Sequence, residues 1–376
     1  MRIGIDCRLA GKRHAGIGRY IENLVRRLPS QVASVTWVLF FHDQEQQSEI
    51  LGNKSLKNVE VVLAPVKHYS MAEQLKMPGI FRRAKLDLLH IPHFNVPLLY
   101  RGKIVVTIHD LLWHEYRGAH VTTLSPVVYW LKYWVYRRVT AAAVKRARVI
   151  FVPAQTIKRV VSKYYSKVEK KIQVTKEGVG VQNLNNSNPI RRLADQIPTG
   201  QKTFSDLLYV GSLYPHKNIK VVVDALKQLP NFTLTLIGSR NVFQDQVKEY
   251  VRKQGVEKQV TFAGYVADEK LGDYYSLALA LVQPSLSEGF GLTGVEALAA
   301  GVPVLASNIP IFNEIYKDAA LYFDPHSADS FIKAVKKLQA SDRKKVVNRG
   351  YKIAKEYSWD KMVQETWQGY QQALKA

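Results

Sequence analysis

The sequence predicts an α/β protein of two domains, each built around a parallel sheet with helices on both faces. The chain has 376 residues, and a single hydrophobic core stops growing at roughly 250–300 residues. Short β-branched runs alternate with longer runs of helical period from start to end, which is typical of βαβ units. The alternation stops at a polar stretch, residues 181–202, and then begins again. That stretch indicates a linker between two domains.

The first domain is expected over residues 1–190. Its first strand, residues 2–6, begins almost at the N-terminus, so we expect no signal peptide. Runs of helical period at residues 17–28 and 122–147 predict two of its helices. Further strands are expected at residues 34–41, 59–64, 103–109, 148–153 and 171–175.

The second domain is expected over residues 191–358. A helix is expected at residues 218–229, between the first two strands. The strands are expected at residues 206–210, 232–237, 260–265, 279–283, 303–307 and 320–323. The closing segment, residues 359–376, is amphipathic, and we expect it to pack back on the first domain.

Charge is unevenly distributed along the chain. The net charge is +23; residues 1–190 carry 30 Lys and Arg against 12 Asp and Glu, and the rest carry 24 against 19. The basic first half predicts an anionic partner, such as a membrane surface, a polyanionic acceptor or nucleic acid. The single cysteine, Cys7, excludes an internal disulfide. No apolar run approaches the roughly 18 residues of a membrane span, so we expect a cytoplasmic protein.

The strongest candidate site is a glycine-rich turn between a strand and a helix, residues 284–297. Such a turn brings backbone N–H groups close to a ligand, and a helix N-terminus favours an anion. Glu288 lies in the turn and Glu296 in the helix. Their separation is too large for an acid–base pair of carboxylates and suits two contacts with different hydroxyls of one ligand. A plain turn with a surface Glu is the structural alternative.

This segment resembles the Glu-x7-Glu signature of the group 1, family 4 glycosyltransferases, which are retaining enzymes with the GT-B fold. The resemblance implies two Rossmann-like domains whose parallel sheets face a central cleft, and sugar transfer from a nucleotide-diphosphate donor. It implies that Glu288 lies near the transferred sugar and Glu296 binds the ribose. The sugar and phosphates are expected at the backbone of Gly289, Phe290, Gly291 and Leu292. Thr293 stands where the family usually has Pro.

The second candidate site, residues 211–218, follows the first strand of the second domain. Lys217 is a point charge suited to phosphate. The family often has an Arg after Gly211, whereas this chain has Ser212; His216 precedes the Lys. The resemblance implies that Lys217 contacts the diphosphate and takes part in catalysis. Whether Ser212 or His216 makes a second phosphate contact is open, and a plain turn with a solvated Lys is the alternative.

Softer signals lie at other element ends. Gly16 and Gly18 begin a helix but lack the third glycine of a dinucleotide fingerprint; the resemblance implies that their loop borders the diphosphate and the acceptor. His109, at a strand end, is either a core histidine or, as the resemblance implies, a catalytic residue facing the sugar. Asp110 is expected either to fix the tautomer of the His109 ring or to cap the turn that follows. The resemblance also implies that Tyr265 lies where the backbone of these enzymes contacts the nucleotide base.

No metal and no cofactor are expected. His90 and His93 flank Pro92 without a carboxylate cluster, and no Asp-x-Asp accompanies them. Resemblance to bacterial mannosyltransferases implies GDP-mannose as donor substrate, with UDP-glucose and UDP-GlcNAc as alternatives. The expected acceptor is a saccharide or a lipid-linked saccharide in cell-surface polysaccharide or glycolipid synthesis. A basic nucleic-acid-binding protein is the alternative from another class, although the dispersed charges and the strand-end motifs disfavour it.

Residues 122–148 mix aromatic and basic side chains. Tyr129, Trp130, Tyr133, Trp134 and Tyr136 lie among Lys and Arg residues. Such a helix docks on an anionic membrane, here the inner face of the cell membrane, or it buries its aromatic side chains in the core. The sequence leaves these two interpretations open.

Overall fold

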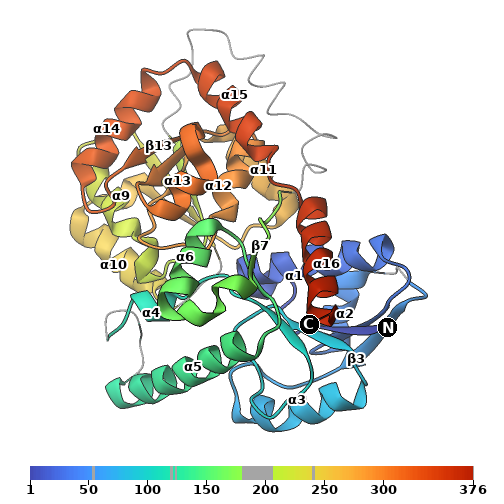
Figure 1. Cartoon of the computed structure of the whole chain (residues 1–376). Coiled ribbons are helices and arrows are strands. Elements are labelled where there is room, and N and C mark those ends of the chain that lie inside the picture. The colour runs from blue at the N-terminus through green and yellow to red at the C-terminus, as the bar shows by residue number, and fades with distance from the viewer. Residues whose placement is uncertain (53–55, 119–121, 123–124, 180–205, 239–241, 376) are drawn as a thin grey trace. The chain divides into compact units, whose positions relative to one another are not determined.

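The structure is a computed structural model that describes all residues except 53–55, 119–121, 123–124, 180–205, 239–241 and 376. The chain forms two compact units (Figure 1). Unit 1 comprises Met1–Glu115, Leu124–Gly178 and Trp359–Ala376, and unit 2 comprises Tyr116–Thr123 and Val179–Ser358. The predicted linker and the predicted boundary at residue 190 lie outside the described residues.

Unit 1 contains a seven-stranded sheet in the order β3-β2-β1-β4-β5-β6-β7, and every neighbouring pair is parallel. The strands are β1 (Arg2–Asp6), β2 (Thr36–Phe41), β3 (Val59–Leu63), β4 (Leu88–Ile91), β5 (Ile104–Thr107), β6 (Ile150–Val152) and β7 (Ile172–Val174). The residues of β4, β5 and β6 are all buried, as expected for parallel strands covered on both faces.

The helices of unit 1 are α1 (Ala15–Gln31), α2 (Gln44–Leu51), α3 (Met71–Arg83), α4 (Leu112–Glu115), α5 (Pro126–Arg146), α6 (Gln155–Tyr164) and α16 (Trp359–Lys375), with 3₁₀ turns at Lys12–His14 and Ser166–Lys171. Helix α16 packs against α1 (Figure 1). Its Tyr370 is buried, and the Tyr370 hydroxyl lies 2.6 Å from Nδ1 of His90 on β4. The C-terminal segment is therefore part of the interior of unit 1.

Unit 2 contains a six-stranded parallel sheet in the order β10-β9-β8-β11-β12-β13. The strands are β8 (Asp206–Val210), β9 (Thr233–Ile237), β10 (Val260–Gly264), β11 (Ala280–Gln283), β12 (Val304–Ser307) and β13 (Ala320–Phe323). The helices are α9 (Ile219–Leu226), α10 (Gln244–Gln254), α11 (Asp268–Leu277), α12 (Leu292–Ala299), α13 (Pro310–Tyr316), α14 (Ala328–Gln339) and α15 (Arg343–Ala354), with 3₁₀ turns at Pro215–Lys217, Glu257–Gln259 and Lys317–Ala319. Helices α9 and α14 pack together on this sheet.

Each sheet has one point where the strand order reverses. In unit 1 the chain runs outward from β1 to β3 and then returns to β4 on the other side of β1. In unit 2 it runs from β8 to β10 and returns to β11 beside β8. Ligands of such sheets bind outside the carboxyl ends of the strands at these switch points. The loops after β1, β4, β8 and β11 are therefore the places to look for a site.

The predicted fold class is confirmed. The strands that were expected are present, with ends that differ by about two residues at most. The sequence analysis did not predict β4 or α3, which together place several buried polar side chains at the switch point of unit 1.

Candidate active site

Two loops of unit 2 bring Lys217 and Glu288 together. Strands β8 and β11 are hydrogen-bonded neighbours, so the loops that follow them meet at one edge of the sheet. Nζ of Lys217 lies 2.5 Å from Oε1 of Glu288, and the Ser285 hydroxyl donates to the same oxygen at 2.9 Å. The backbone N–H of Leu286 donates to the carbonyl of His216 at 2.8 Å. The two strongest sequence motifs therefore form one polar cluster.

The Lys217–Glu288 pair determines which groups of the cluster carry charge. Burial opposes ionisation of the Glu288 carboxyl, but the Lys217 ammonium outweighs burial and lowers the pKa of Glu288 below its ordinary value. Burial, together with the charge of Lys217, lowers the pKa of His216 to about 4. At neutral pH, Glu288 is thus an ionised hydrogen-bond acceptor and His216 is a neutral imidazole.

Asn218 fixes the backbone beside Lys217. Its φ of 54° lies in the left-handed region, which Asn tolerates better than most residues. Its side-chain amide donates to the carbonyl of Pro284 at 3.1 Å and to that of Pro325 at 2.8 Å. Asn218 thereby joins the loops that follow β8, β11 and β13, and it holds Lys217 in a defined position.

The N-terminus of α12 forms the other side of the cluster. Gly291 precedes the helix with φ 88°, and a Cβ there would lie 2.2 Å from the Tyr316 hydroxyl, which donates to the carbonyl of Gly291. No side chain of the N-cap residue Gly291 covers the first backbone N–H groups of α12, and helix N-termini carry partial positive charge. The Phe290 side chain is buried against Tyr357, and the Leu292 side chain is buried too. A ligand would therefore contact these two residues through their backbone.

The remaining predicted residues of unit 2 lie in the segments that follow β8, β10 and β11. Gly211 and Ser212 follow β8, and the Ser212 carbonyl accepts a hydrogen bond from Tyr209 at 2.5 Å. Gly289 is half-buried beside Glu288, and Glu296 is half-buried within α12. Tyr265 follows β10 and is exposed. Their contacts with a donor stay predictions.

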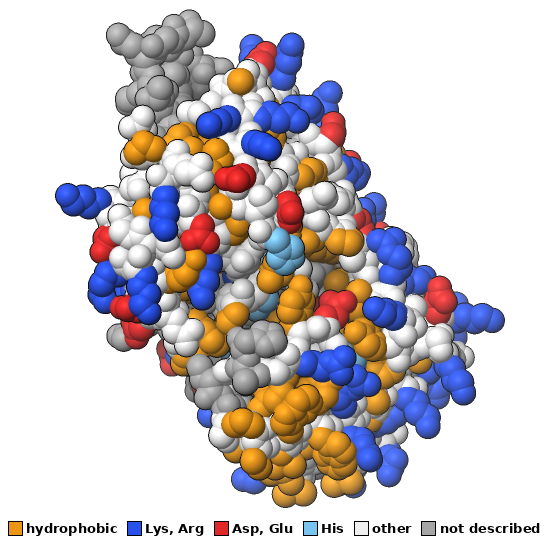
Figure 2. All heavy atoms as spheres, turned by 90° about the vertical axis from the view of Figure 1, so that its left-hand side faces the viewer, with side chains coloured by type: hydrophobic (Ala, Val, Ile, Leu, Met, Phe, Trp, Pro, Cys, Tyr) orange, Lys and Arg blue, Asp and Glu red, His pale blue; other side chains and the backbone are white. Residues whose placement is uncertain are grey.

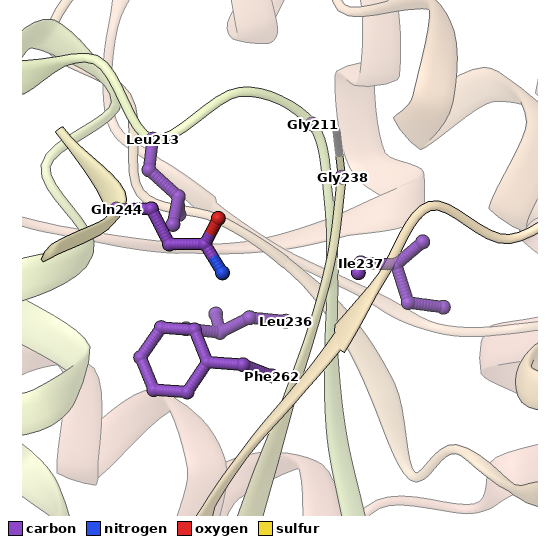
Figure 3. A pocket seen from close by; sticks show the side chains of 8 residues that line it. Gly211, Leu213, Leu236, Ile237, Gly238, Gln244 and Phe262 are labelled. Atoms are coloured by element: carbon purple, nitrogen blue, oxygen red, sulfur yellow. The ribbon is translucent and has the colours of Figure 1, made fainter. Parts of the chain in front are cut away.

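A hollow lies at the carboxyl ends of β8, β9 and β10. It is lined by Gly211, Leu213, Leu236, Ile237, Gly238, Gln244, Phe262 and Gly264. Figure 3 shows the Gln244 amide facing Leu236 and Phe262. Its free volume is only about 10 Å³, about the space of one water.

In unit 1, the predicted residue His109 is paired with a carboxylate that the sequence analysis missed. Nδ1 of His109 lies 3.3 Å from Oε1 of Glu177, and both side chains are buried. The His109 ring meets Tyr20 edge-on at 4.9 Å, while its Nε2 has no hydrogen-bond partner within the part of the chain that the structure describes. Of the two roles expected for Asp110, capping is observed, because its Oδ1 accepts from Leu112 N–H at 3.0 Å.

The switch point of unit 1 contains a buried ion cluster that was not predicted. Arg8, just after β1, lies 2.6 Å from Asp6 and 2.9 Å from Glu73 of α3. Asn95, in the loop after β4, donates to the other oxygen of Glu73. Burial opposes ionisation of Asp6, but the Arg8 guanidinium outweighs it and lowers the pKa of Asp6. Nδ1 of His68, a partly exposed side chain, also lies 3.0 Å from Oε1 of Glu73, whereas Arg8, Asp6 and Glu73 are almost fully buried.

Gly18 has a structural explanation. It is buried in α1, and a Cβ there would lie 2.0 Å from the carbonyl oxygen of Gly11. Gly18 thereby lets α1 approach the loop after β1 closely. Gly16 is exposed with open space around it. Ligand contacts by these two glycines stay predictions.

The two histidines considered as metal ligands have other partners. His90 contacts the hydroxyls of Tyr370 and Thr107. His93 lies 3.2 Å from the Tyr69 hydroxyl and accepts from the backbone N–H of Asn95. Within the described residues, no group of three or more His, Cys, Asp or Glu side chains is arranged to hold a metal ion.

Comparison with protein families identifies the chain. The family described as "Glycosyl transferases group 1" matches residues 192–355, and "Glycosyltransferase Family 4" matches residues 14–183. The chain belongs to the group 1, family 4 glycosyltransferases. The first match contains the Lys217–Glu288 cluster, and the second contains His109 and Glu177.

Individual relatives of this glycosyltransferase agree with that assignment. It is 26% identical to O-antigen chain mannosyltransferase B of Escherichia coli, over 94% of this chain and 95% of the relative. It is 27% identical to the O-antigen chain mannosyltransferase RfbU of Salmonella typhimurium, over 80% and 78% of the two chains.

Solved structures confirm the GT-B fold. A sucrose-phosphate synthase of Thermosynechococcus elongatus superimposes with a TM-score of 0.75 at 18% identity, over 99% of this chain and 98% of the other. The HepE protein of Anabaena, solved with UDP and glucose, superimposes with a TM-score of 0.71 at 17% identity, over 98% and 99%.

Proposed function

We propose that this glycosyltransferase transfers mannose from GDP-mannose to a saccharide or lipid-linked saccharide in cell-surface polysaccharide or glycolipid synthesis. We propose further that it does so with retention of configuration and without a metal ion. One observation carries the proposal: a lysine and an ionised carboxylate lie together at the switch point of unit 2, beside a helix N-terminus. The names of the two bacterial relatives support mannose as the sugar.

The chemistry of the cluster suits a nucleotide diphosphate sugar. As the bond between the sugar and the diphosphate breaks, negative charge develops on the departing phosphate. Lys217 and the partial positive charge at the start of α12 stabilise that charge. This electrostatic role is the one that a metal ion fills in other transferases. Ionised Glu288 accepts hydrogen bonds from sugar hydroxyls, and Glu296, further along α12, is assigned to the ribose.

Retention follows if the acceptor attacks the face from which the diphosphate leaves. In that step the bond from the anomeric carbon to the phosphate oxygen breaks, the bond to the acceptor oxygen forms, and the acceptor proton passes to the departing phosphate. Glu288 is already paired with Lys217, which argues against its acting as a nucleophile. An Nδ1–H of His109 donated to Glu177 leaves Nε2 as an acceptor for a hydroxyl of the transferred sugar.

The donor is tested by thermal unfolding with GDP-mannose, UDP-glucose, UDP-GlcNAc and GDP-fucose. A ligand at 100 times its Kd adds about 2.7 kcal/mol to the free energy of unfolding. We expect the largest increase in Tm with GDP-mannose. A larger increase with a UDP-sugar would replace mannose as the proposed sugar, and no increase with any nucleotide sugar would remove the proposal.

The reaction itself is then tested with the donor that binds. We expect transfer to continue at an unchanged rate in excess EDTA and the product to keep the anomeric configuration of the donor by NMR. Activity that EDTA removes and manganese or magnesium restores would contradict the metal-free mechanism. An inverted product would contradict retention.

A further inference from the structure

Helix α5 has two aromatic faces with opposite surroundings. The tyrosines at positions 129, 133 and 136 are buried, together with Val139 and Ala143. The tryptophans point the other way: Trp130 is 53% exposed and Trp134 is 55% exposed. We define the outer face of α5 by its exposed apolar side chains, Val127, Val128, Trp130, Leu131, Trp134 and Val135. The interpretation of these aromatic residues as core is confirmed for the tyrosines and is wrong for the tryptophans, while docking on a membrane stays a prediction.

The inner face holds α5 firmly in unit 1. The Tyr136 hydroxyl lies 2.6 Å from Nδ1 of buried His114, and the Tyr136 ring packs on Trp113 and Phe94. The orientation of the helix is therefore fixed by its buried side. Exposure of the outer face is a consequence of that packing, and contiguous exposed apolar surface marks an interaction site.

The charge on α5 indicates what kind of partner this face has. The helix carries no acidic residue and has cations at Lys132, Arg137, Arg138, Lys145 and Arg146. The Arg138 guanidinium lies 4.6 Å from the centre of the Trp134 ring, so a cation and an aromatic ring are presented together. Hydrophobic side chains gather at the lower end of the face shown in Figure 2, with Lys and Arg side chains at their margin.

We propose that the outer face of α5 docks on an anionic lipid bilayer. Tryptophans prefer the boundary between headgroups and acyl chains, because their rings are apolar with one polar N–H. In this orientation Trp130 and Trp134 enter that boundary, and Lys132 and Arg138 contact lipid phosphates. Among the described residues, no helix is long and apolar enough to cross a membrane. Docking therefore means a helix that lies along the surface.

A second copy of the chain fits this face less well than lipid does. A symmetric dimer through α5 places the same surface of both copies in contact. The exposed cations Lys132 and Arg138 of one helix would then lie near those of the other, with no acidic residue of α5 to neutralise them. A bilayer rich in phosphatidylglycerol supplies both the apolar phase and the negative charge.

The test is co-sedimentation of the full chain with vesicles, without nucleotide sugar, so that its outcome is independent of the proposed donor. We expect binding to phosphatidylglycerol-rich vesicles at low salt, and little binding to phosphatidylcholine vesicles or at high salt, since salt screens charges beyond about 10 Å. Trp130→Ser/Trp134→Ser should weaken binding by about tenfold or more, because the variant lacks the two aromatic rings that enter the bilayer. Val242→Ser/Leu277→Ser, which replaces exposed apolar residues of unit 2, should leave it unchanged.

A charge series separates the electrostatic part of the interaction. Lys132→Gln/Arg138→Gln should weaken binding to anionic vesicles, whereas Lys333→Gln/Lys336→Gln on exposed positions of α14 should not. Circular dichroism and an unchanged Tm show that each variant is folded. Three results would overturn the proposal: no sedimentation with either vesicle type, binding by the double Trp variant equal to that of the unchanged chain, or a dimer that the Trp substitutions dissociate in the absence of vesicle binding.

Discussion

The charged groups at the two switch points differ in how far water reaches them. At β1 and β4, the side chains of Arg8 and Asp6 are 0% and 2% exposed. At β8 and β11, the side chains of Lys217 and Glu288 are 19% and 15% exposed. A buried cluster whose charges are paired with one another holds its elements in place, because losing one partner leaves a buried charge. A partly exposed pair is able to exchange one partner for a ligand, so of these two clusters the one in unit 2 is expected to bind the donor and the one in unit 1 to hold the fold.

The largest effect is expected where the buried cluster is broken. Arg8→Met leaves Asp6 and Glu73 as buried carboxylates without their cation, and such a loss destabilises by about 3–5 kcal/mol. The matched control is Arg2→Met, which breaks the exposed pair with Glu60 and should cost about 0–1 kcal/mol. Urea unfolding measures both. Equal free energies of unfolding for the two variants would show that the buried Arg8 cluster contributes no more to stability than the exposed pair does.

The next largest effect is expected on turnover. Lys217→Ala removes the cation that faces the departing phosphate, and loss of such a group lowers kcat by about 10²–10³. Without the ammonium, burial alone acts on the Glu288 carboxyl, so the pKa of Glu288 should rise. As the pH is lowered, the remaining activity should therefore be lost at a higher pH than in the unchanged enzyme. Lys227→Ala, at the exposed position directly after α9, is the control. A normal kcat in Lys217→Ala would exclude the assigned role.

A smaller effect, on affinity, is expected at Glu296. Glu296→Ala should weaken nucleotide binding by about 1.5–3 kcal/mol, the value of a hydrogen bond to a charged group. Glu288→Ala, by contrast, should mainly lower turnover. Isothermal titration with GDP measures the affinity, and Glu249→Ala on α10 serves as a surface control. Unchanged GDP affinity in Glu296→Ala would contradict contact with the ribose.

The smallest effect concerns acid stability. The pKa of His216 is lowered from 6.5 to about 4, so between these pH values the unfolded chain binds a proton that the folded chain does not. This group therefore lowers stability as pH falls from 6.5 to 4. His216→Gln should remove about 1–2 kcal/mol of that loss, while His326→Gln, at an exposed position, should not. Identical pH curves for the unchanged chain and His216→Gln would show that the His216 ring titrates as in water.

The parts of the molecule that sequence predicted depend on local signals. Strand, glycine turn and helix follow one another directly in residues 279–299, so the loop that carries Glu288 was recognisable. Glu73 and Glu177 were missed because they lie 65 and 68 residues from Arg8 and His109 in sequence, and only the folded sheet brings them together. Strand β4 was missed because it is short and contains His90.

The two faces of α5 show the same limit. Aromatic residues at positions 129–136 were recognised, but periodicity alone did not assign the tyrosines to the interior and the tryptophans to the surface. Both faces are apolar, so no contrast between them exists in the sequence. Packing of Tyr136 on His114, which is 22 residues away in sequence, determines the orientation of the helix.

The return of α16 to unit 1 bears on how the protein is made. During synthesis, N-terminal domains generally fold first. Here α16 contributes Tyr370, Trp359 and Met362 to the buried interior of unit 1, and these residues are synthesised after the whole of unit 2. Unit 2 has its whole sequence available earlier, so the domain that is begun first is completed last. Until α16 has been synthesised, the chain therefore carries an unfinished first domain next to a second domain whose sequence is complete.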